Sequence, residues 1–177
     1  MEPQHVRITL SCPDDRGLLA AVAARLYDLG GDIGDAAFSL LGDEAQMTCI
    51  ASFPASTTPE AVRAALAGLP ALKDATIAVE RFSGGRTHPE SGHATHVVTV
   101  QGDDRPGLMA RLAEGFGETG ANVVRMDAER RADGDYRMRF AIWVPKGRAE
   151  ACLANAANAA ERMGLRFSSS EVGPGER

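Results

Sequence analysis

The sequence predicts an α+β fold in which two domains share one pattern of strands and helices. The first observation is a repeat, because Asp14-Asp15-Arg16-Gly17-Leu18 recurs as Asp104-Arg105-Pro106-Gly107-Leu108, 90 residues further along the chain. The second is that hydrophobic periodicity follows the order β-α-β-β-α-β in both halves. The third is that glycine and proline separate the segments at matching places. Together these observations predict two ferredoxin-like domains, each an antiparallel four-stranded sheet with two helices on one face.

The elements of the first half follow from periodicity and turn residues. Apolar alternation from Val6 predicts a strand, and helical spacing after Gly17 predicts a helix that Gly30 ends. The turn Gly42-Asp43-Glu44 joins the next two strands, and Pro59 stands in the first turn of a second helix. The predicted strands span 5–11, 33–41, 46–53 and 75–82, and the predicted helices span 17–29 and 58–68.

The second half repeats this order. A strand leads into a helix at Gly107, and a hairpin follows that turns at Asp133-Gly134-Asp135. An alanine-rich helix then ends at Gly164, and a last strand closes the domain. The predicted strands span 96–101, the two arms of the hairpin 122–144, and 165–169, and the predicted helices span 107–119 and 148–163.

The chain is expected to divide into two domains with a polar linker between them. The segment Ser83 to His93 contains Gly, Pro, Ser and His and has no apolar periodicity. The predicted divisions are a first domain over 1–82, a linker over 83–94, a second domain over 95–170, and a flexible tail over 171–177.

Composition narrows the class of function. The net charge of −5 gives no general attraction to nucleic acid or to an anionic membrane. No apolar run reaches the ~20 residues that a membrane-spanning helix needs, and the N-terminus lacks the features of a signal peptide. The three cysteines share no metal-ligand spacing and fit reduced thiols. These features predict a soluble cytoplasmic protein, without a metal or other cofactor.

Chemistry-bearing motifs outside the repeat are few. His88, His93 and His96 cluster near the linker, but no acidic or thiol ligand accompanies them, which argues against a metal site. Cys12 precedes the first repeated loop, yet no partner histidine is evident, and a buried, inert thiol is the favoured interpretation. The sequence contains no nucleophile-base-acid set and no phosphate loop, so no enzyme is expected.

The repeated strand-to-helix loop is the strongest candidate site. It places backbone N–H groups at a helix N-terminus beside Gly17 or Gly107, a geometry that favours a carboxylate. Asp32 or Asn122 opens the next strand, near the opposite end of that helix, and in a paired assembly could face a neighbour's loop. An acid or amide there suits an ammonium group, so the two halves of an amino-acid site are present. The alternative is that Asp14, Asp15, Asp103 and Asp104 merely cap helices.

The motif resembles that of the ACT domain, a regulatory module that typically binds amino acids and pairs sheet to sheet or side by side. Gly102, Asp104-Arg105-Pro106-Gly107-Leu108, Gly120 and Asn122-Val123 match the family pattern. The first half departs from it, with Asp15 where Arg is usual, Arg16 where Pro is usual, and Asp32 in place of Asn. Binding is therefore expected more at the second loop than at the first. The implied ligand-binding residues are Asp104, Arg105, Pro106, Gly107, Leu108, Asn122 and Val123, and in the first half Asp14, Asp15, Gly17, Leu18 and Asp32.

Two such domains with nothing attached resemble the glycine cleavage system transcriptional repressor family. The resemblance implies a non-enzymatic, amino-acid-sensing regulator of a one-carbon or amino-acid pathway. Its expected partners are a small amino acid such as glycine or serine, a transcription factor or metabolic enzyme, and further copies of the chain. Alternatives are a free-standing regulatory subunit of an amino-acid enzyme and the ACT-like leader of a formyltetrahydrofolate deformylase, for which the chain ends too soon. Direct DNA binding is not expected, since the charge is acidic and no recognition helix is evident.

A difference between the halves predicts an interface. Carried without a gap, the 90-residue offset aligns Met47, Cys49 and Phe53 with Arg137, Arg139 and Trp143. If this set lies on the helix-free face, the first sheet presents an apolar patch there that pairing would bury. The alternative is a register shift of one residue, which would exchange the two faces.

Overall fold

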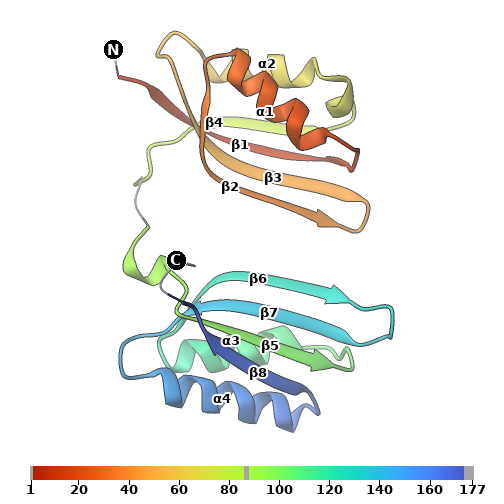
Figure 1. Ribbon diagram of the computed structural model, residues 1–177, viewed down its shortest axis with the longest axis vertical. Coiled ribbons are helices and arrows are strands. Elements are labelled where there is room, and N and C mark those ends of the chain that lie inside the picture. Colours follow the sequence, from red (N-terminus) through yellow and green to blue (C-terminus); the bar gives the residue numbers. More distant parts are fainter. Residues whose placement is uncertain (1, 86–87, 174–177) are drawn as a thin grey trace. The chain divides into compact units, whose positions relative to one another are not determined.

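The computed structural model describes residues 2–85 and 88–173, which form two compact units that divide between Gly84 and Gly85. Each unit is one four-stranded antiparallel sheet with two helices on one face (Figure 1). The predicted fold class is therefore confirmed. The finer division into a linker over 83–94 and a tail over 171–177 stays a prediction, and residues 86–87 and 174–177 lie outside the described residues.

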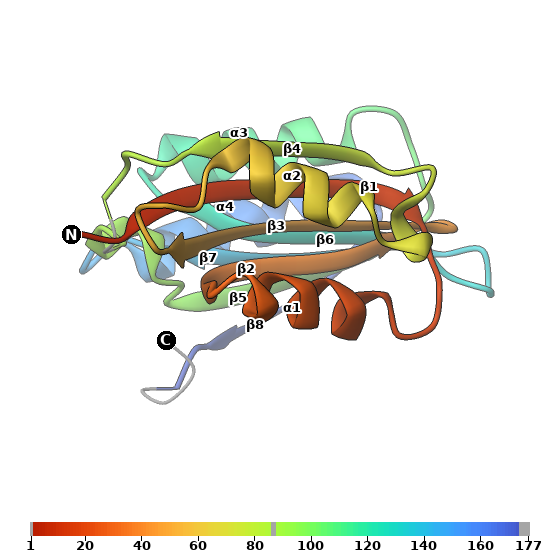
Figure 2. The same ribbon diagram turned by 90° about the horizontal axis from the view of Figure 1, so that it is seen from above.

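The first unit has the predicted order β-α-β-β-α-β. Its sheet order is β2-β3-β1-β4, so the two central strands are β3 and β1. Helices α1 and α2 run along the strands, as Figure 2 shows from above. A 3₁₀ turn, Pro70–Leu72, follows α2. The elements are β1 (Gln4–Pro13), α1 (Leu18–Asp28), β2 (Asp32–Leu41), β3 (Glu44–Phe53), α2 (Pro59–Ala67) and β4 (Thr76–Arg81).

The second unit repeats this arrangement with sheet order β6-β7-β5-β8. It begins with a feature that the sequence did not predict, a 3₁₀ turn at Glu90–Gly92 inside the expected linker. The other elements are β5 (His96–Gly102), α3 (Leu108–Glu118), β6 (Asn122–Arg130), β7 (Tyr136–Trp143), α4 (Ala149–Arg162) and β8 (Arg166–Glu171).

Each core lies between the sheet and its two helices. The alternation that predicted β1 buries Val6, Ile8 and Leu10 under the helices, because successive strand residues point to opposite faces. Helical spacing buries Leu18, Val22 and Leu26 of α1 against them. The second core matches the first with Leu108, Leu112 and Phe116 of α3, and its largest members include Phe140 and Met138.

The predicted helix-free apolar patch is wrong. Met47, Cys49 and Phe53 all lie in the first core, beneath the helices. Ala36 pairs with Cys49, whereas its counterpart Met126 pairs with Phe140, so Cys49 corresponds to Phe140 and the offset over β7 is 91. The hairpin between β6 and β7 thus contains one additional residue.

One extra residue exchanges the two faces of a strand, because side chains alternate with a period of two. Phe53 therefore corresponds to Val144, and Trp143 corresponds to Ser52. The helix-free face of the first sheet is polar where the prediction placed an apolar patch, since Thr9 and Thr48 are exposed there. On the second sheet Arg137 does lie on the helix-free face, opposite Glu129. The interface that was expected to bury Met47 and Phe53 has no basis in this fold.

Candidate functional site

The repeated loop has the same backbone geometry in both units. Gly17 and Gly107 are the N-cap residues of α1 and α3, with φ of 80° and 85°. Residues with a side chain rarely adopt this left-handed conformation, which accounts for glycine at both positions. No heavy atom lies within 4 Å of where a Cβ would stand, so the space beside each helix start is open.

The acidic residues of the loops do not cap the helices. Among the described residues no side chain caps α1 or α3. Asp15 accepts a hydrogen bond from the N–H of its neighbour Arg16 at 2.7 Å, and Asp103 pairs with Arg105 at 3.4 Å. The interpretation of these carboxylates as helix caps is therefore wrong. The N–H groups of Leu18 and Leu108 donate to the carbonyls of Asp15 and Arg105 at 3.2 and 3.4 Å. The next N–H groups of each first turn have no side-chain partner and can receive an anion, which the positive end of the helix dipole would attract.

Asp104 connects the second loop to the edge of the sheet. Its carboxylate forms an ion pair with Arg130, the last residue of β6. In the first unit the residue that corresponds to Arg130 is Leu40, which is exposed. The second loop is thus held by a side-chain ion pair, whereas the first is held by a backbone hydrogen bond from the N–H of Asp14 to the carbonyl of Asp43 at 2.9 Å.

Asn122 lies at the other end of the same domain. It begins β6 and follows the C-terminus of α3, an 11-residue helix that spans roughly 16 Å at about 1.5 Å per residue. Its Nδ2 donates a hydrogen bond to the carbonyl of Ser91 at 2.8 Å. Asp32 has the corresponding place in the first unit. One domain therefore does not bring the loop and this residue together.

Leu18 and Leu108 are core residues. Each is about 5% exposed or less, so only their backbone groups can face a ligand.

Val123, in contrast, is exposed on β6, and it is one of several exposed apolar residues that the sequence reasoning missed. Consecutive apolar pairs such as Val123-Val124 and Leu40-Leu41 were the available signal, since they break the alternation of a half-buried strand. The exposed large apolar residues are Leu19, Tyr27, Phe38, Leu40 and Leu41 in the first unit, and Met109, Val123, Val124 and Met126 in the second.

Comparison with known proteins identifies the fold. No protein-family model matches the sequence, and no curated protein matches it significantly. A crystal structure of an unknown protein from Galdieria sulphuraria matches with a TM-score of 0.76 and 19% identity, over 97% of this chain and 100% of the other. One named "putative glycine cleavage system transcriptional repressor" matches with a TM-score of 0.71 and 20% identity, over 97% and 99%. The chain has a tandem ACT-type fold. Likeness at this level of identity concerns the fold alone.

The thiols of the ACT-type domains are buried. Burial raises the pKa of Cys12, helped by the charges of Asp14 and Glu44, and burial raises the pKa of Cys49 to about 11. Both thiols therefore stay protonated near neutral pH, a state that is a poor nucleophile. The third, Cys152, is buried too.

The histidines near the start of the second ACT-type domain have other roles. The rings of His88 and His93 meet edge to face with centroids 5.9 Å apart, and His96 is hydrogen-bonded to Thr95. Within residues 2–85 and 88–173, no group of His, Cys, Asp or Glu has the geometry for a metal ion. In the same ranges no helix is long and apolar enough to cross a membrane.

Charged side chains join the hairpin of the second ACT-type domain to its other strands. Asp135 accepts hydrogen bonds from Arg166 on β8 and, at 3.0 Å, from Gln101 on β5. The hydrogen bond from Arg166 is the main reason that the pKa of Asp135 lies below its ordinary value of 3.8, with smaller contributions from Gln101 and Arg131. This network forms at the end of the sheet that carries the Asp104 loop.

Arg166→Gln should raise the pKa of Asp135 towards its ordinary value, because the principal hydrogen bond to the charged carboxylate is lost. A lowered pKa in the folded state contributes stability above the unfolded value, and this contribution disappears as the pH falls through the folded value. The carboxyl ¹³C chemical shift of Asp135, followed by NMR from pH 7 downwards, measures the change. Arg131→Gln is the matched control and should have a smaller effect. An unchanged pKa in Arg166→Gln would contradict the assignment.

Proposed function

We propose that this protein is a non-enzymatic, amino-acid-sensing regulator, and that the Asp104–Leu108 loop of its second domain receives the carboxylate of the ligand. The observation that carries the proposal is the ion pair between Asp104 and Arg130, which ties this loop to the end of β6. The uncapped first turn of α3 provides N–H donors beside the open space at Gly107.

The second half of the ligand site would come from another copy of the chain. Strand β6 is an edge strand, and it exposes Val123, Val124 and Met126. Such an edge favours pairing with another strand. β6 begins at Asn122 and ends at Arg130, so antiparallel pairing of two β6 strands would place Asn122 of one copy beside Arg130 and Asp104 of the other. Homo-oligomerisation is therefore part of the proposal.

The expected ligand is a small amino acid such as glycine or serine. Its carboxylate would accept hydrogen bonds from the backbone N–H groups of Arg105 and Gly107 and from the first turn of α3, since Pro106 has no N–H and the N–H of Leu108 donates to the Arg105 carbonyl. Its ammonium would lie near Oδ1 of Asn122 from the neighbouring copy. In the first domain, Asp14, Asp15, Gly17, Leu18 and Asp32 offer a weaker version, because the loop there lacks the ion pair to the sheet edge.

Asn122→Ala should weaken amino-acid binding roughly 10- to 150-fold, the equivalent of about 1.5–3 kcal/mol for one charge-assisted hydrogen bond. Thermal-shift screening of the twenty amino acids would identify the ligand, and isothermal titration calorimetry would measure its affinity. Asp32→Ala is the matched control from the first domain and should have a smaller effect.

Asn122→Asp separates a binding role from a structural one. It keeps an oxygen for the ammonium but loses the Nδ2 donor to the Ser91 carbonyl. If Asn122 binds the ligand, Asn122→Asp should keep the affinity for the amino acid that Asn122→Ala loses. If Asn122 only holds residues 90–92, Asn122→Asp and Asn122→Ala should lose affinity to the same extent. Absence of amino-acid binding below millimolar concentration, or equal effects of Asn122→Ala and Asp32→Ala, would overturn the ligand proposal. Sedimentation of the wild-type protein as a monomer would overturn the paired site.

The regulator would act by contacting a protein partner in the cytoplasm, either a transcription factor or a metabolic enzyme. This contact would alter the expression of genes of a one-carbon or amino-acid pathway. The motif resemblance supports this pathway assignment. The second candidate is a free-standing regulatory subunit of an amino-acid metabolic enzyme, a role that a pair of ACT-type domains also suits. Co-purification of a catalytic subunit whose activity responds to the amino acid would favour that alternative.

A further inference from the structure

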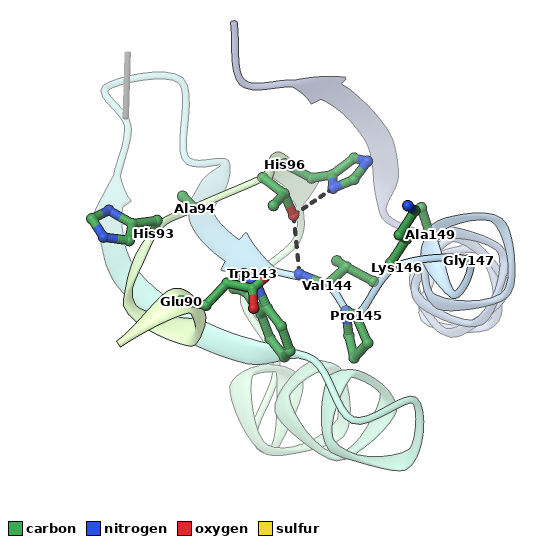
Figure 3. A pocket seen from close by; sticks show the side chains of 11 residues that line it. Glu90, His93, Ala94, His96, Trp143, Val144, Pro145, Lys146, Gly147 and Ala149 are labelled. Carbon is green, nitrogen blue, oxygen red and sulfur yellow. Dashed lines mark hydrogen bonds between the residues drawn. The ribbon is translucent and has the colours of Figure 1, made fainter. Parts of the chain in front are cut away.

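A cavity of about 520 Å³ opens at the end of the second domain that lies opposite the Asp104–Leu108 loop. Its walls come from the segment before β5, the ends of β5 and β7, and the loop into α4 (Figure 3). Pockets for small organic ligands measure roughly 300–1,000 Å³, so the cavity has the size of a ligand site. Every lining residue belongs to the second unit.

One wall of the cavity is aromatic and apolar. Trp143 and Pro145 lie along it, and Trp143 is half-buried at the end of β7. Trp143 is also the single tryptophan of the chain. An indole ring that is only partly covered offers a flat surface on which another ring can stack.

Polar groups occupy the two sides. Figure 3 shows Lys146 and the start of α4 on one side, and Glu90 and His93 on the other. The N-cap residue of α4 is Arg148, which makes no side-chain capping hydrogen bond, so first-turn N–H groups of this 14-residue helix lack a side-chain partner. An anion is therefore favoured beside Lys146, and a hydrogen-bond donor beside the carboxylate of Glu90.

The upper wall is built by buried polar contacts. His96 is only 8% exposed, and its Nδ1 lies 2.9 Å from Oγ1 of Thr95. The same Oγ1 accepts a hydrogen bond from the N–H of Val144 at 3.0 Å. Nε2 of His96 has no hydrogen-bond partner among the described residues. These contacts join the segment at the start of β5 to the end of β7 on this side of the cavity.

The first domain has different residues at the corresponding places. Ser52 corresponds to Trp143 and Val6 to His96, and Thr58 caps α2 by accepting a hydrogen bond from the N–H of Ala61 at 3.2 Å. The aromatic wall, the buried imidazole and the uncapped helix thus occur together in the second domain only. Since both domains have the same fold, the fold itself does not require these residues.

We propose that this cavity binds a small aromatic acid that carries a hydrogen-bond donor opposite its carboxylate. The ring stacks on Trp143, the carboxylate lies between Lys146 and the first turn of α4, and the donor reaches Glu90. This cavity shares no lining residue with the proposed amino-acid site, although Asn122 of that site donates a hydrogen bond to the carbonyl of Ser91, next to Glu90. The proposal does not rest on amino-acid binding.

The fluorescence of Trp143 tests the proposal directly in the full-length protein, because no other tryptophan contributes. The probe is 4-hydroxybenzoate, with 4-hydroxybenzamide as the form without the negative charge and benzoate as the form without the hydroxyl. We expect 4-hydroxybenzoate to quench the fluorescence saturably, and the amide to bind roughly 10-fold or more weakly. Benzoate should bind more weakly than 4-hydroxybenzoate, and glycine should not compete.

Lys146→Ala should weaken binding of 4-hydroxybenzoate by a similar factor. Lys73→Ala is the matched control, because Lys73 is the only other lysine and is exposed in the first domain; it should bind like the wild type. Calorimetry with Trp143→Phe, which keeps a ring, should show weaker binding. The proposal would be overturned if millimolar 4-hydroxybenzoate gave neither saturable quenching nor heat of binding. Equal affinities for 4-hydroxybenzoate and 4-hydroxybenzamide, or an unchanged affinity in Lys146→Ala, would also overturn it.

Discussion

Phe116→Ala should lower the free energy of unfolding of the second domain by about 3–5 kcal/mol, as expected when a buried aromatic side chain leaves a cavity. Phe116 is 1% exposed in the last turn of α3, and its ring meets that of Phe140 edge to face with centroids 5.3 Å apart. Aromatic pairs of this kind contribute about 0.5–1.5 kcal/mol beyond their burial. Few other positions in this domain combine both contributions.

Urea denaturation followed by the fluorescence of Trp143 would measure this loss, because the reporter lies in the second domain. Phe116→Leu is a milder substitution, since leucine (Leu26) has the corresponding place in the first domain. It should lower the free energy of unfolding less than Phe116→Ala does. Met109→Ala is the matched control in the same helix, because Met109 is exposed. A loss below about 1.5 kcal/mol for Phe116→Ala would mean that α3 does not pack on the sheet as described.

Gly31→Ala should destabilise the first domain by about 1–3 kcal/mol through overpacking. A Cβ at Gly31 would lie 2.4 Å from Cε1 of Phe53 and 2.7 Å from the carbonyl oxygen of Leu26. In the second domain the corresponding residue is Ala121, which packs against the core there, and the residue that corresponds to Phe53 is the smaller Val144. The larger Phe53 thus accompanies glycine in the first domain, and the smaller Val144 accompanies alanine in the second.

A double-mutant cycle tests this coupling. The double variant Gly31→Ala/Phe53→Val reproduces the residue pair of the second domain. Its loss in free energy of unfolding should be smaller than the sum of the two single losses by about 0.5–3 kcal/mol, the range for residues in contact. Far-UV circular dichroism during urea denaturation would record the unfolding of both domains, and the fluorescence of Trp143 would identify the part that belongs to the second. Gly115→Ala is the control, because a Cβ there meets nothing within 4 Å inside α3 and should stabilise by about 0.5–1 kcal/mol. Strict additivity of the two first-domain changes would contradict the proposed contact.

The fold was largely predictable because its signals are local. Alternation in β1, helical spacing after Gly17 and the breaks at glycine act within a few residues, and all eight strands appear in the predicted order. The paired loops were also predictable, because only glycine readily takes the backbone conformation found at Gly17 and Gly107. The repeat itself then predicted that both halves share one architecture.

The side-chain roles were less predictable. One additional residue in the second hairpin changed which face of β7 is buried, and a pattern with a period of two cannot reveal such a shift when both alternations contain apolar residues. Asp15 and Asp104 suited helix capping by position, yet they contact Arg16 and Arg130. Local composition names the groups that can form a hydrogen bond, but the partner depends on which distant segments meet.

Two βαββαβ domains, their order along the chain and the two glycine loops could be derived from the amino-acid sequence, because these depend on backbone conformation and on the burial of periodic apolar residues. Three arrangements required the folded structure: the ion pair of Asp104 with the end of β6, the place of Asn122 at the opposite end of α3, and the cavity lined by Trp143, Lys146 and Glu90. These arrangements join residues that are distant in the chain. Their geometry is therefore set by how strands pair and helices pack.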